Sequence, residues 1–162
     1  MKLLHIIAPV IIILSLAACT APVLEDAGQL NKAASLPAAF DFNKMGLKVI
    51  TSSVNRKTGT MSTLYGNATA FDYVVDSTDN QYPAGSVLAL ITWKQQEDKR
   101  WYGANIPGEL LTVEMVKKGA TADDISYKQY EGQALSPAPG IDTLQQNARI
   151  RYILAQKPAI LP

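Results

Sequence analysis

The sequence predicts an α+β domain that is rich in β-structure, with an antiparallel sheet followed by a C-terminal helix. Two observations support this prediction. Between residues 46 and 131, runs of β-branched, aromatic and aliphatic residues alternate with stretches rich in Gly, Pro, Asn and Asp, which favour turns. After residue 140, apolar residues recur at the spacing of a helix.

The first predicted feature is a hairpin, and a short helix is expected before it, near Phe40. Residues 46–54 (GLKVITSSV) and 60–65 (TMSTLY) are β-favouring runs separated by Asn-Arg-Lys-Thr-Gly, a composition typical of a turn. Residues 68–75 (ATAFDYVV) have the composition of a further strand, and residues 76–85 (DSTDNQYPAG) that of a loop. The sheet is therefore expected to continue through residues 68–75.

The strongest predicted strand is residues 86–94 (SVLALITWK). One of its faces is apolar along most of its length, while the other is apolar only in its first half. This pattern favours a central strand that is buried on both faces where it begins. Residues 95–99 (QQEDK) predict a charged turn, and residues 100–105 (RWYGAN) predict a returning strand that residues 106–108 (IPG) end.

Two more strands and a helix complete the predicted domain. Residues 111–116 alternate between the two faces of a strand, and residues 125–131 form a shorter strand. Asp142 followed by Gln145 resembles a capping box, which predicts the start of a helix. The apolar residues that recur at helical spacing after it are Leu144, Ala148 and Tyr152.

The N-terminus has the pattern of a bacterial lipoprotein signal. Lys2 supplies a positive charge, and residues 3–16 are almost wholly apolar but too short to span a hydrocarbon layer of about 30 Å comfortably. Residues 16–19 read Leu-Ala-Ala-Cys, the lipobox pattern. We therefore predict that residues 1–18 are a signal peptide and that Cys19 carries acyl chains such as palmitate. The competing interpretation is an ordinary secretory signal that leaves Cys19 a free thiol.

The domain boundaries follow from this assignment. Residues 19–39 are small and polar and show no helical or strand period, which predicts a lipidated N-terminus and a flexible tether. Residues 40–162 then form a single domain with one core. Thr20 follows Cys19 where Asp would retain a lipoprotein elsewhere, so similarity to Gram-negative sorting implies the outer membrane. The expected location is the cell envelope, with the domain facing the periplasm.

Composition excludes several classes of function for the mature chain. Loss of Lys2 leaves 14 basic residues against 14 acidic ones, so no basic surface is expected and nucleic-acid binding is not predicted. His5 is the only histidine and Cys19 the only cysteine. Ser-His-Asp and Cys-His mechanisms, and zinc sites built on His or Cys, are therefore not expected. We predict no catalytic residue and no metal site.

A ligand pocket is the remaining kind of site that the sequence suggests. Large aromatic side chains dominate both pockets and cores, and a carboxylate inside an apolar strand requires a partner if it faces inward. The residues expected in such a pocket are Tyr65, Trp93, Trp101, Glu114 and Tyr130. The alternative for the aromatic residues is ordinary core packing, and the alternative for Glu114 is the polar face of its strand.

Three stretches together resemble the cytochrome P-460 family. They are residues 60–70 (TMSTLYGNATA), residues 82–93 (YPAGSVLALITW) and residues 112–116 (TVEMV), in the order and at the spacing seen in that family. The resemblance implies a curved antiparallel sheet and, often, a homodimer. In the haem-bearing members it also implies haem c, attached near the C-terminus through Cys-x-x-Cys-His, and oxidation of hydroxylamine or binding of nitric oxide.

The haem-attachment motif is missing from this chain. At the corresponding place, residues 144–156 read LQQNARIRYILAQ, without a thiol or an imidazole. Covalent haem c is thereby excluded, no cofactor is predicted, and no catalytic residue is carried over from the family. We expect a lipid-anchored protein with a haem-less domain that binds a small ligand or an envelope protein, and no enzyme. The alternative is a haem-binding or redox protein that holds haem non-covalently, for example through Tyr130.

Overall fold

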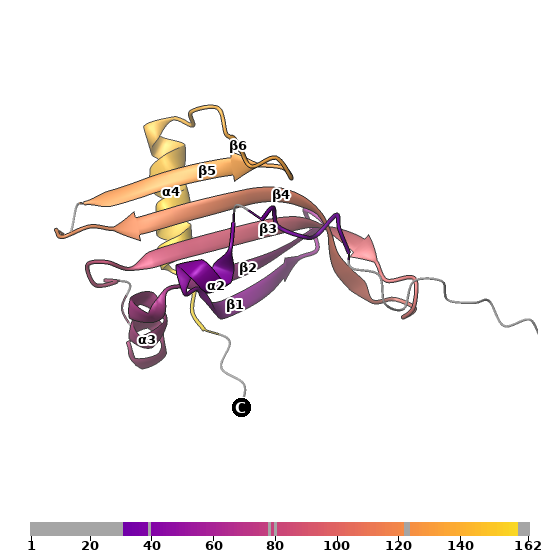
Figure 1. The fold of residues 1–162 in the computed structure, drawn as a ribbon, viewed down its shortest axis with the longest axis horizontal. Helices are drawn as coiled ribbons and strands as arrows, with labels where there is room; N and C mark the ends of the chain where they lie inside the picture. The colour runs from indigo at the N-terminus through magenta and orange to yellow at the C-terminus, as the bar shows by residue number, and fades with distance from the viewer. Residues whose placement is uncertain (1–30, 39, 78, 80, 122–123, 159–162) are drawn as a thin grey trace, which may run out of the picture. The chain divides into compact units, whose positions relative to one another are not determined.

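A single antiparallel sheet of six strands organises the described part of the chain (Figure 1). The computed structural model describes residues 31–38, 40–77, 79, 81–121 and 124–158. The predicted signal peptide and Cys19 lie outside these residues. No helix of the described ranges is long and apolar enough to cross a membrane.

The strands follow one another in the sheet in the order in which they occur along the chain. They are β1 (Lys48–Asn55), β2 (Thr60–Gly66), β3 (Val87–Glu97), β4 (Asn105–Lys118), β5 (Ile125–Glu131) and β6 (Ser136–Pro137). The helices are α2 (Phe42–Met45), α3 (Ala68–Asp76) and α4 (Thr143–Leu154). The β-rich α+β fold with a C-terminal helix is thereby confirmed, as is the short helix near Phe40.

Both faces of the sheet are covered, so the central strand β3 is buried on both sides. Its residues alternate between two cores, with Leu88 and Leu90 on one face and Ile91 on the other. The first face packs against α3 and α4, and α4 runs across the strands (Figure 1). The second face packs against residues 34–47, which include α2.

The two cores are made of different kinds of side chain. The core on the helical face is mainly aliphatic and contains Ile50, Leu64, Ala70, Val74, Tyr82, Leu88, Leu90, Val116, Ile150 and Ile153. The core on the opposite face contains Phe40, Ala89, Ile91, Trp93, Leu110, Val113 and Met115. Each large apolar side chain buried in this way contributes about 1.5–3 kcal/mol to stability.

Residues 68–75 form helix α3, so the prediction of a strand there is wrong. Asn67 caps the helix, because its side-chain oxygen accepts a hydrogen bond of 3.1 Å from the Ala70 backbone N–H. Ala70 and Val74 lie one helical turn apart and are both buried. The β-favouring residues Phe71, Tyr73 and Val75 misled the prediction, because tertiary burial and the cap outweighed their propensity.

The second hairpin is longer than the sequence suggested, and its return strand begins later. Residues 100–104 belong to the turn, in which the Asp98 carboxylate accepts a 2.9 Å hydrogen bond from the Arg100 N–H and Gly103 has φ of 76°. β4 starts at Asn105 and continues through Pro107, so the predicted break at residues 106–108 is wrong. Pro107 is tolerated because it lies beside a register shift between Trp93 and Gln95.

Helix α4 begins where the sequence predicted, but a different face of it is buried. Asp142 is the N-cap, and its carboxylate accepts a hydrogen bond of 2.8 Å from the Gln145 N–H. Ile150 and Ile153 are buried, whereas Leu144 is 82% exposed and Tyr152 is 43% exposed. The expected apolar stripe through Leu144 and Tyr152 is therefore wrong.

Residues 31–38, the last part of the expected tether, lie against the sheet. The side-chain amide of Asn31 donates a 2.7 Å hydrogen bond to the Pro107 carbonyl, and the Leu110 N–H donates to the Ala33 carbonyl at 3.2 Å. The Gln133 side-chain amide lies within hydrogen-bond distance of the same Ala33 carbonyl and of the Lys32 and Ser35 carbonyls, at 2.7 to 3.1 Å. Residues 31–38 thus belong to the compact unit that contains the sheet.

Candidate functional site

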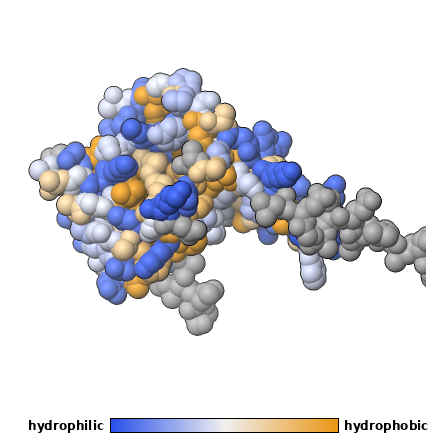
Figure 2. Space-filling view, viewed as in Figure 1, coloured by the Kyte–Doolittle hydropathy of each residue, from blue (hydrophilic) through white to orange (hydrophobic). Residues whose placement is uncertain are grey.

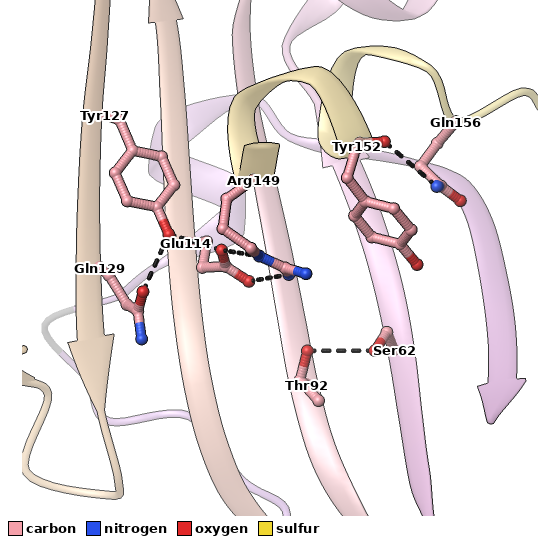
Figure 3. A network of polar contacts seen from close by, with 8 residues as sticks. All are labelled: Ser62, Thr92, Glu114, Tyr127, Gln129, Arg149, Tyr152 and Gln156. Carbon is pink, nitrogen blue, oxygen red and sulfur yellow. Dashed lines mark hydrogen bonds and ion pairs between the residues drawn. The ribbon is translucent and has the colours of Figure 1, made fainter. Parts of the chain in front are cut away.

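A buried carboxylate on β4 is the centre of a polar network on the helical face (Figure 3). Glu114 is only 3% exposed. The Arg149 guanidinium on α4 binds it through both oxygens, with Nε 2.8 Å from Oε1 and Nη2 2.5 Å from Oε2. The Tyr127 hydroxyl donates to Oε1 at 2.6 Å. These contacts are charge-assisted, which makes them stronger than hydrogen bonds between neutral groups.

Three neighbouring elements position this network. Glu114 lies opposite Gln129 in the pairing of β4 with β5, and Tyr127 lies two residues before Gln129 on the same face. The Tyr127 hydroxyl is also 2.9 Å from Gln129 Oε1, but a phenol has one hydrogen, and the carboxylate competes for it more strongly. Helix α4 crosses this face and supplies Arg149.

The network raises the pKa of both Arg149 and Tyr127. The hydrogen bond to Glu114 is the main reason that the pKa of Arg149 is raised. Burial, followed by the hydrogen bond to Glu114, raises the pKa of Tyr127 well above that of a free phenol. Arg149 therefore stays charged and Tyr127 stays protonated at neutral pH. These states suit a structural contact between α4 and the sheet better than proton transfer.

A polar pocket of about 450 Å³ lies beside this network. Its lining consists of Thr92, Thr112, Glu114, Gln129, Ile141, Gln145, Ala148 and Arg149. The Thr92 hydroxyl is 3.1 Å from that of Ser62 on β2, which extends the polar row across the sheet (Figure 3). The carboxylate of Glu114 is already bound by Arg149, so this pocket offers hydroxyl and amide groups to a ligand.

A second pocket, which we call the aromatic pocket, lies on the opposite face of the sheet. It has a volume of about 610 Å³ and is lined by Ala34, Ser35, Leu36, Pro37, Ala38, Phe40, Asp41, Phe42, Lys44, Tyr65 and Trp93. Phe42 and Tyr65 stack with ring centroids 4.3 Å apart, and the Trp93 indole donates to the Ala34 carbonyl at 2.9 Å. The aromatic pocket therefore has fixed, flat walls.

Tyr65 differs from Tyr127 in a way that matters for ligand binding. Burial raises the pKa of Tyr65, but no described residue forms a hydrogen bond with its hydroxyl. The Tyr65 hydroxyl is therefore uncommitted within the described residues, whereas the Tyr127 hydroxyl donates to Glu114. Lys44 also lines this pocket; it is largely exposed, and its ammonium lies 3.4 Å from the Asp41 carboxylate.

The five residues predicted to line one pocket lie in separate places. Tyr65 and Trp93 line the aromatic pocket, and Glu114 lines the polar pocket. Tyr130 lines a third pocket, of about 370 Å³, between β5 and the residues before α4. Trp101 is 69% exposed in the β3–β4 turn.

Sequence reasoning missed the residues that complete the two larger pockets. Arg149 lies within the predicted helix, but the prediction considered only the apolar residues at helical spacing. The signal that could have found it was the need of a buried Glu114 for a cation. Phe42 lies within the short predicted helix, and no feature of the sequence pairs it with Tyr65.

Within the described residues, no group of three or more His, Cys, Asp or Glu is placed to hold a metal ion.

The fold and its pockets define a small open-sheet domain that offers binding surfaces on both faces. The family model described as Cytochrome P460 matches residues 41–149, which include every described strand and most of α4. This chain belongs to the Cytochrome P460 family. A comparison with curated proteins gave no match.

Family membership corrects one prediction from the sequence. Proteins of the Cytochrome P460 family bind haem, so the expectation that this chain has no cofactor is wrong. The prediction equated the absence of Cys-x-x-Cys-His with the absence of haem. That motif forms the covalent link, whereas haem iron can also be held by other side chains, tyrosine included.

The residues present decide what form of haem binding fits. Covalent attachment at α4 does not fit, because residues 143–154 contain neither Cys nor His. The polar pocket beside α4 offers no free side chain of the kinds that hold haem iron. The aromatic pocket fits better, since it combines flat aromatic walls and a tyrosine side chain within a volume typical of cofactor sites.

Proposed function

We propose that this chain is a lipid-anchored envelope protein whose Cytochrome P460 domain binds haem non-covalently in the aromatic pocket. The observation that supports this most is the Tyr65 side chain, which lines that pocket and whose hydroxyl forms no hydrogen bond with a described residue. In this proposal Tyr65 supplies the phenolate oxygen that holds the iron. Bound haem would give the domain redox or gas-binding chemistry.

The other residues of the aromatic pocket have distinct parts in the proposal. Phe42 and Trp93 provide flat apolar surface for the porphyrin ring. Lys44 pairs with Asp41, and its exposed ammonium has further donors with which it can also bind a propionate. Trp93 is fixed by its hydrogen bond to the Ala34 carbonyl, which ties one wall of the pocket to residues 34–38.

The test is an absorbance titration of purified mature protein with hemin. The wild type should shift the Soret band and bind at a one-to-one ratio. Tyr65→Phe removes the oxygen and keeps the ring, so haem affinity should fall by about tenfold or more. Tyr130→Phe is the matched control, because Tyr130 lines a different pocket, and it should bind like the wild type.

The pH dependence of binding gives a second readout. Tyr65 loses its proton when its oxygen holds the iron, and burial keeps the pKa of the free residue above that of a free phenol. Haem affinity should therefore rise with pH across the neutral range in the wild type but not in Tyr65→Phe. A wild type that leaves the hemin spectrum unchanged, or equal affinity in the Tyr65 and Tyr130 variants, would contradict the haem proposal.

The location is the second part of the proposal, and it is supported by the lipobox at residues 16–19. A mature N-terminus at Cys19 with bound acyl chains places the domain at a membrane. Mass spectrometry of the N-terminal peptide tests this directly. An unmodified Cys19, or a mature chain that begins elsewhere, would overturn the anchor without bearing on haem binding.

A further inference from the structure

The β3–β4 hairpin extends beyond the rest of the sheet (Figure 1). Its turn carries two exposed aromatic side chains. Trp101 is 69% exposed and Tyr102 is fully exposed, and neither belongs to a core. The last paired residues of the hairpin are Glu97 and Asn105, so both aromatics lie in the turn itself. We call residues 98–104 the hairpin tip.

The tip is a folded turn that holds these aromatic side chains outward. The Asp98 N–H donates to the Ala104 carbonyl at 2.9 Å, and the Ala104 N–H donates to the Trp101 carbonyl at 3.0 Å. Asp98 also pairs with the Arg100 side chain at 3.3 Å. These hydrogen bonds close the turn. The two rings are therefore exposed by a defined backbone conformation.

The described chain enters the domain beside this hairpin. Asn31 donates its side-chain amide to the Pro107 carbonyl, and Ala33 accepts from the Leu110 N–H. Both partners lie on β4, in the part of the strand that follows the tip. From Cys19 to Asn31 the chain can span at most about 40 Å, so a lipid on Cys19 limits the distance between Asn31 and the bilayer to that length.

We propose that the hairpin tip inserts Trp101 and Tyr102 into the interface of the bilayer that holds the Cys19 lipid. This inference rests on the anchor in the proposed function and adds a second contact, which fixes the orientation of the domain. Trp and Tyr are the side chains that favour the headgroup level of a bilayer, because one part of each is apolar and another forms hydrogen bonds.

Charge at the tip agrees with a phospholipid surface. The Asp98 carboxylate accepts hydrogen bonds from the Arg100 backbone N–H and from its Nε. Lys99 forms no ion pair with a described residue. Lys99 therefore remains available to a lipid phosphate beside the two aromatic rings.

Tryptophan fluorescence tests this proposal without a label, because the chain has two tryptophans. Trp93 is 7% exposed and bound to Ala34, so a bilayer quencher should reach only Trp101. The lipidated protein is placed on phosphatidylethanolamine and phosphatidylglycerol vesicles that contain brominated phospholipid. We expect blue-shifted and quenched Trp101 emission, and complete loss of the quenching in Trp101→Phe.

The control is Leu144→Ala, which removes an exposed apolar side chain from α4 and should leave the quenching unchanged. Lipidated protein that binds vesicles with Trp101 unquenched would overturn the tip contact and leave the anchor intact. If the chain proves unlipidated, added vesicles should still quench Trp101, and their failure to do so overturns the proposal. A soluble dimer that Trp101→Ala abolishes would assign the tip to a protein partner and also overturn it.

Discussion

Glu114 shows how one residue links the centre of the sheet to the last helix. Its carboxylate lies among apolar neighbours on β4, and the cation that satisfies it comes from α4, 35 positions along the chain. A buried ion pair contributes little net stability compared with apolar packing, but removing one partner leaves a buried charge. The pair therefore specifies how α4 docks more than it strengthens the domain.

The first prediction concerns Arg149. Arg149→Met should destabilise the domain by about 3 kcal/mol, near the lower end for a broken buried pair because part of Arg149 is exposed. Arg151→Met, on the exposed side of the same helix, should cost at most about 0.5 kcal/mol. Urea unfolding measures both changes. Equal stabilities for the two variants would show that the ion pair does not hold the helix.

The second prediction concerns Tyr82, whose hydroxyl is buried and has no partner among the described residues. Burial raises its pKa to about 12, from 10.0 in an unfolded chain. The unfolded state therefore loses this proton first, so the contribution of Tyr82 to stability is full below pH 10 and is lost as the pH rises toward 12.

Tyr82→Phe should consequently match or exceed the wild type by up to about 1 kcal/mol at pH 7, because it removes an unsatisfied hydroxyl. It should also lose less stability between pH 10 and pH 12. Thermal unfolding across this range measures the effect. Tyr102→Phe changes a fully exposed tyrosine and should follow the wild-type pH profile, so identical profiles for both variants would refute the assignment.

At the scale of elements, α3 depends on one side chain that also holds the start of β3. Besides capping the helix, Asn67 accepts from the Val87 N–H at 3.1 Å and donates to the Gly85 carbonyl at 2.9 Å. The helix and the strand that follows it are thus joined through a single amide.

The third prediction compares the two helix caps. Asn67→Ala should cost about 2–3 kcal/mol, because it removes the cap and two further hydrogen bonds. Asp142→Ala removes one capping hydrogen bond from α4 and should cost about 1 kcal/mol. Denaturant midpoints at a constant slope measure the difference. Equal losses for the two variants would mean that Asn67 acts as a cap alone.

The sequence predicted best those elements that are determined by residues close together along the chain. β5 has the predicted bounds, and the N-cap of α4 was correct because Asp142 and Gln145 form a local signal. Helix α3 was missed because its side-chain propensities favour a strand. In addition, two of the hydrogen bonds of its capping residue, Asn67, are to residues 85–87. These hydrogen bonds join parts of the chain that a local pattern does not connect.

The candidate sites were harder to predict for the same reason. Tyr65 and Trp93 were among five residues expected in one pocket, and both line the aromatic pocket, but Phe42, which stacks on Tyr65, comes from a separate helix. Tyr130 was grouped with them because aromatic composition does not distinguish the pockets. Only the pairing of strands and the docking of residues 34–44 determine which aromatics meet.

At the scale of the whole molecule, the two cores share one sheet, which should make them unfold together. Ile153 on α4 is fully buried on the helical face, and Trp93 lies on the opposite face. The fourth prediction is that Ile153→Ala costs about 2–4 kcal/mol and shifts the Trp93 fluorescence transition as much as the far-ultraviolet circular dichroism transition.

A Trp101→Phe background makes Trp93 the only emitter in that experiment. Leu144→Ala, on the same helix but 82% exposed, should change stability by less than about 0.5 kcal/mol. Separate midpoints for the two probes would mean that each face of the sheet unfolds independently.

The two edge strands of the sheet affect whether copies of the protein can associate at high concentration. At one edge, β1 has a register irregularity between Val49 and Thr51 and begins with Lys48, and at the other edge β6 is two residues long and includes Pro137. Irregularity, charge and proline all discourage a further strand from joining an edge. If the anchor proposed above is present, it concentrates the copies in two dimensions, where protected edges matter most. We expect two copies to associate through side-chain surfaces, and the sheet to resist growth into fibrils.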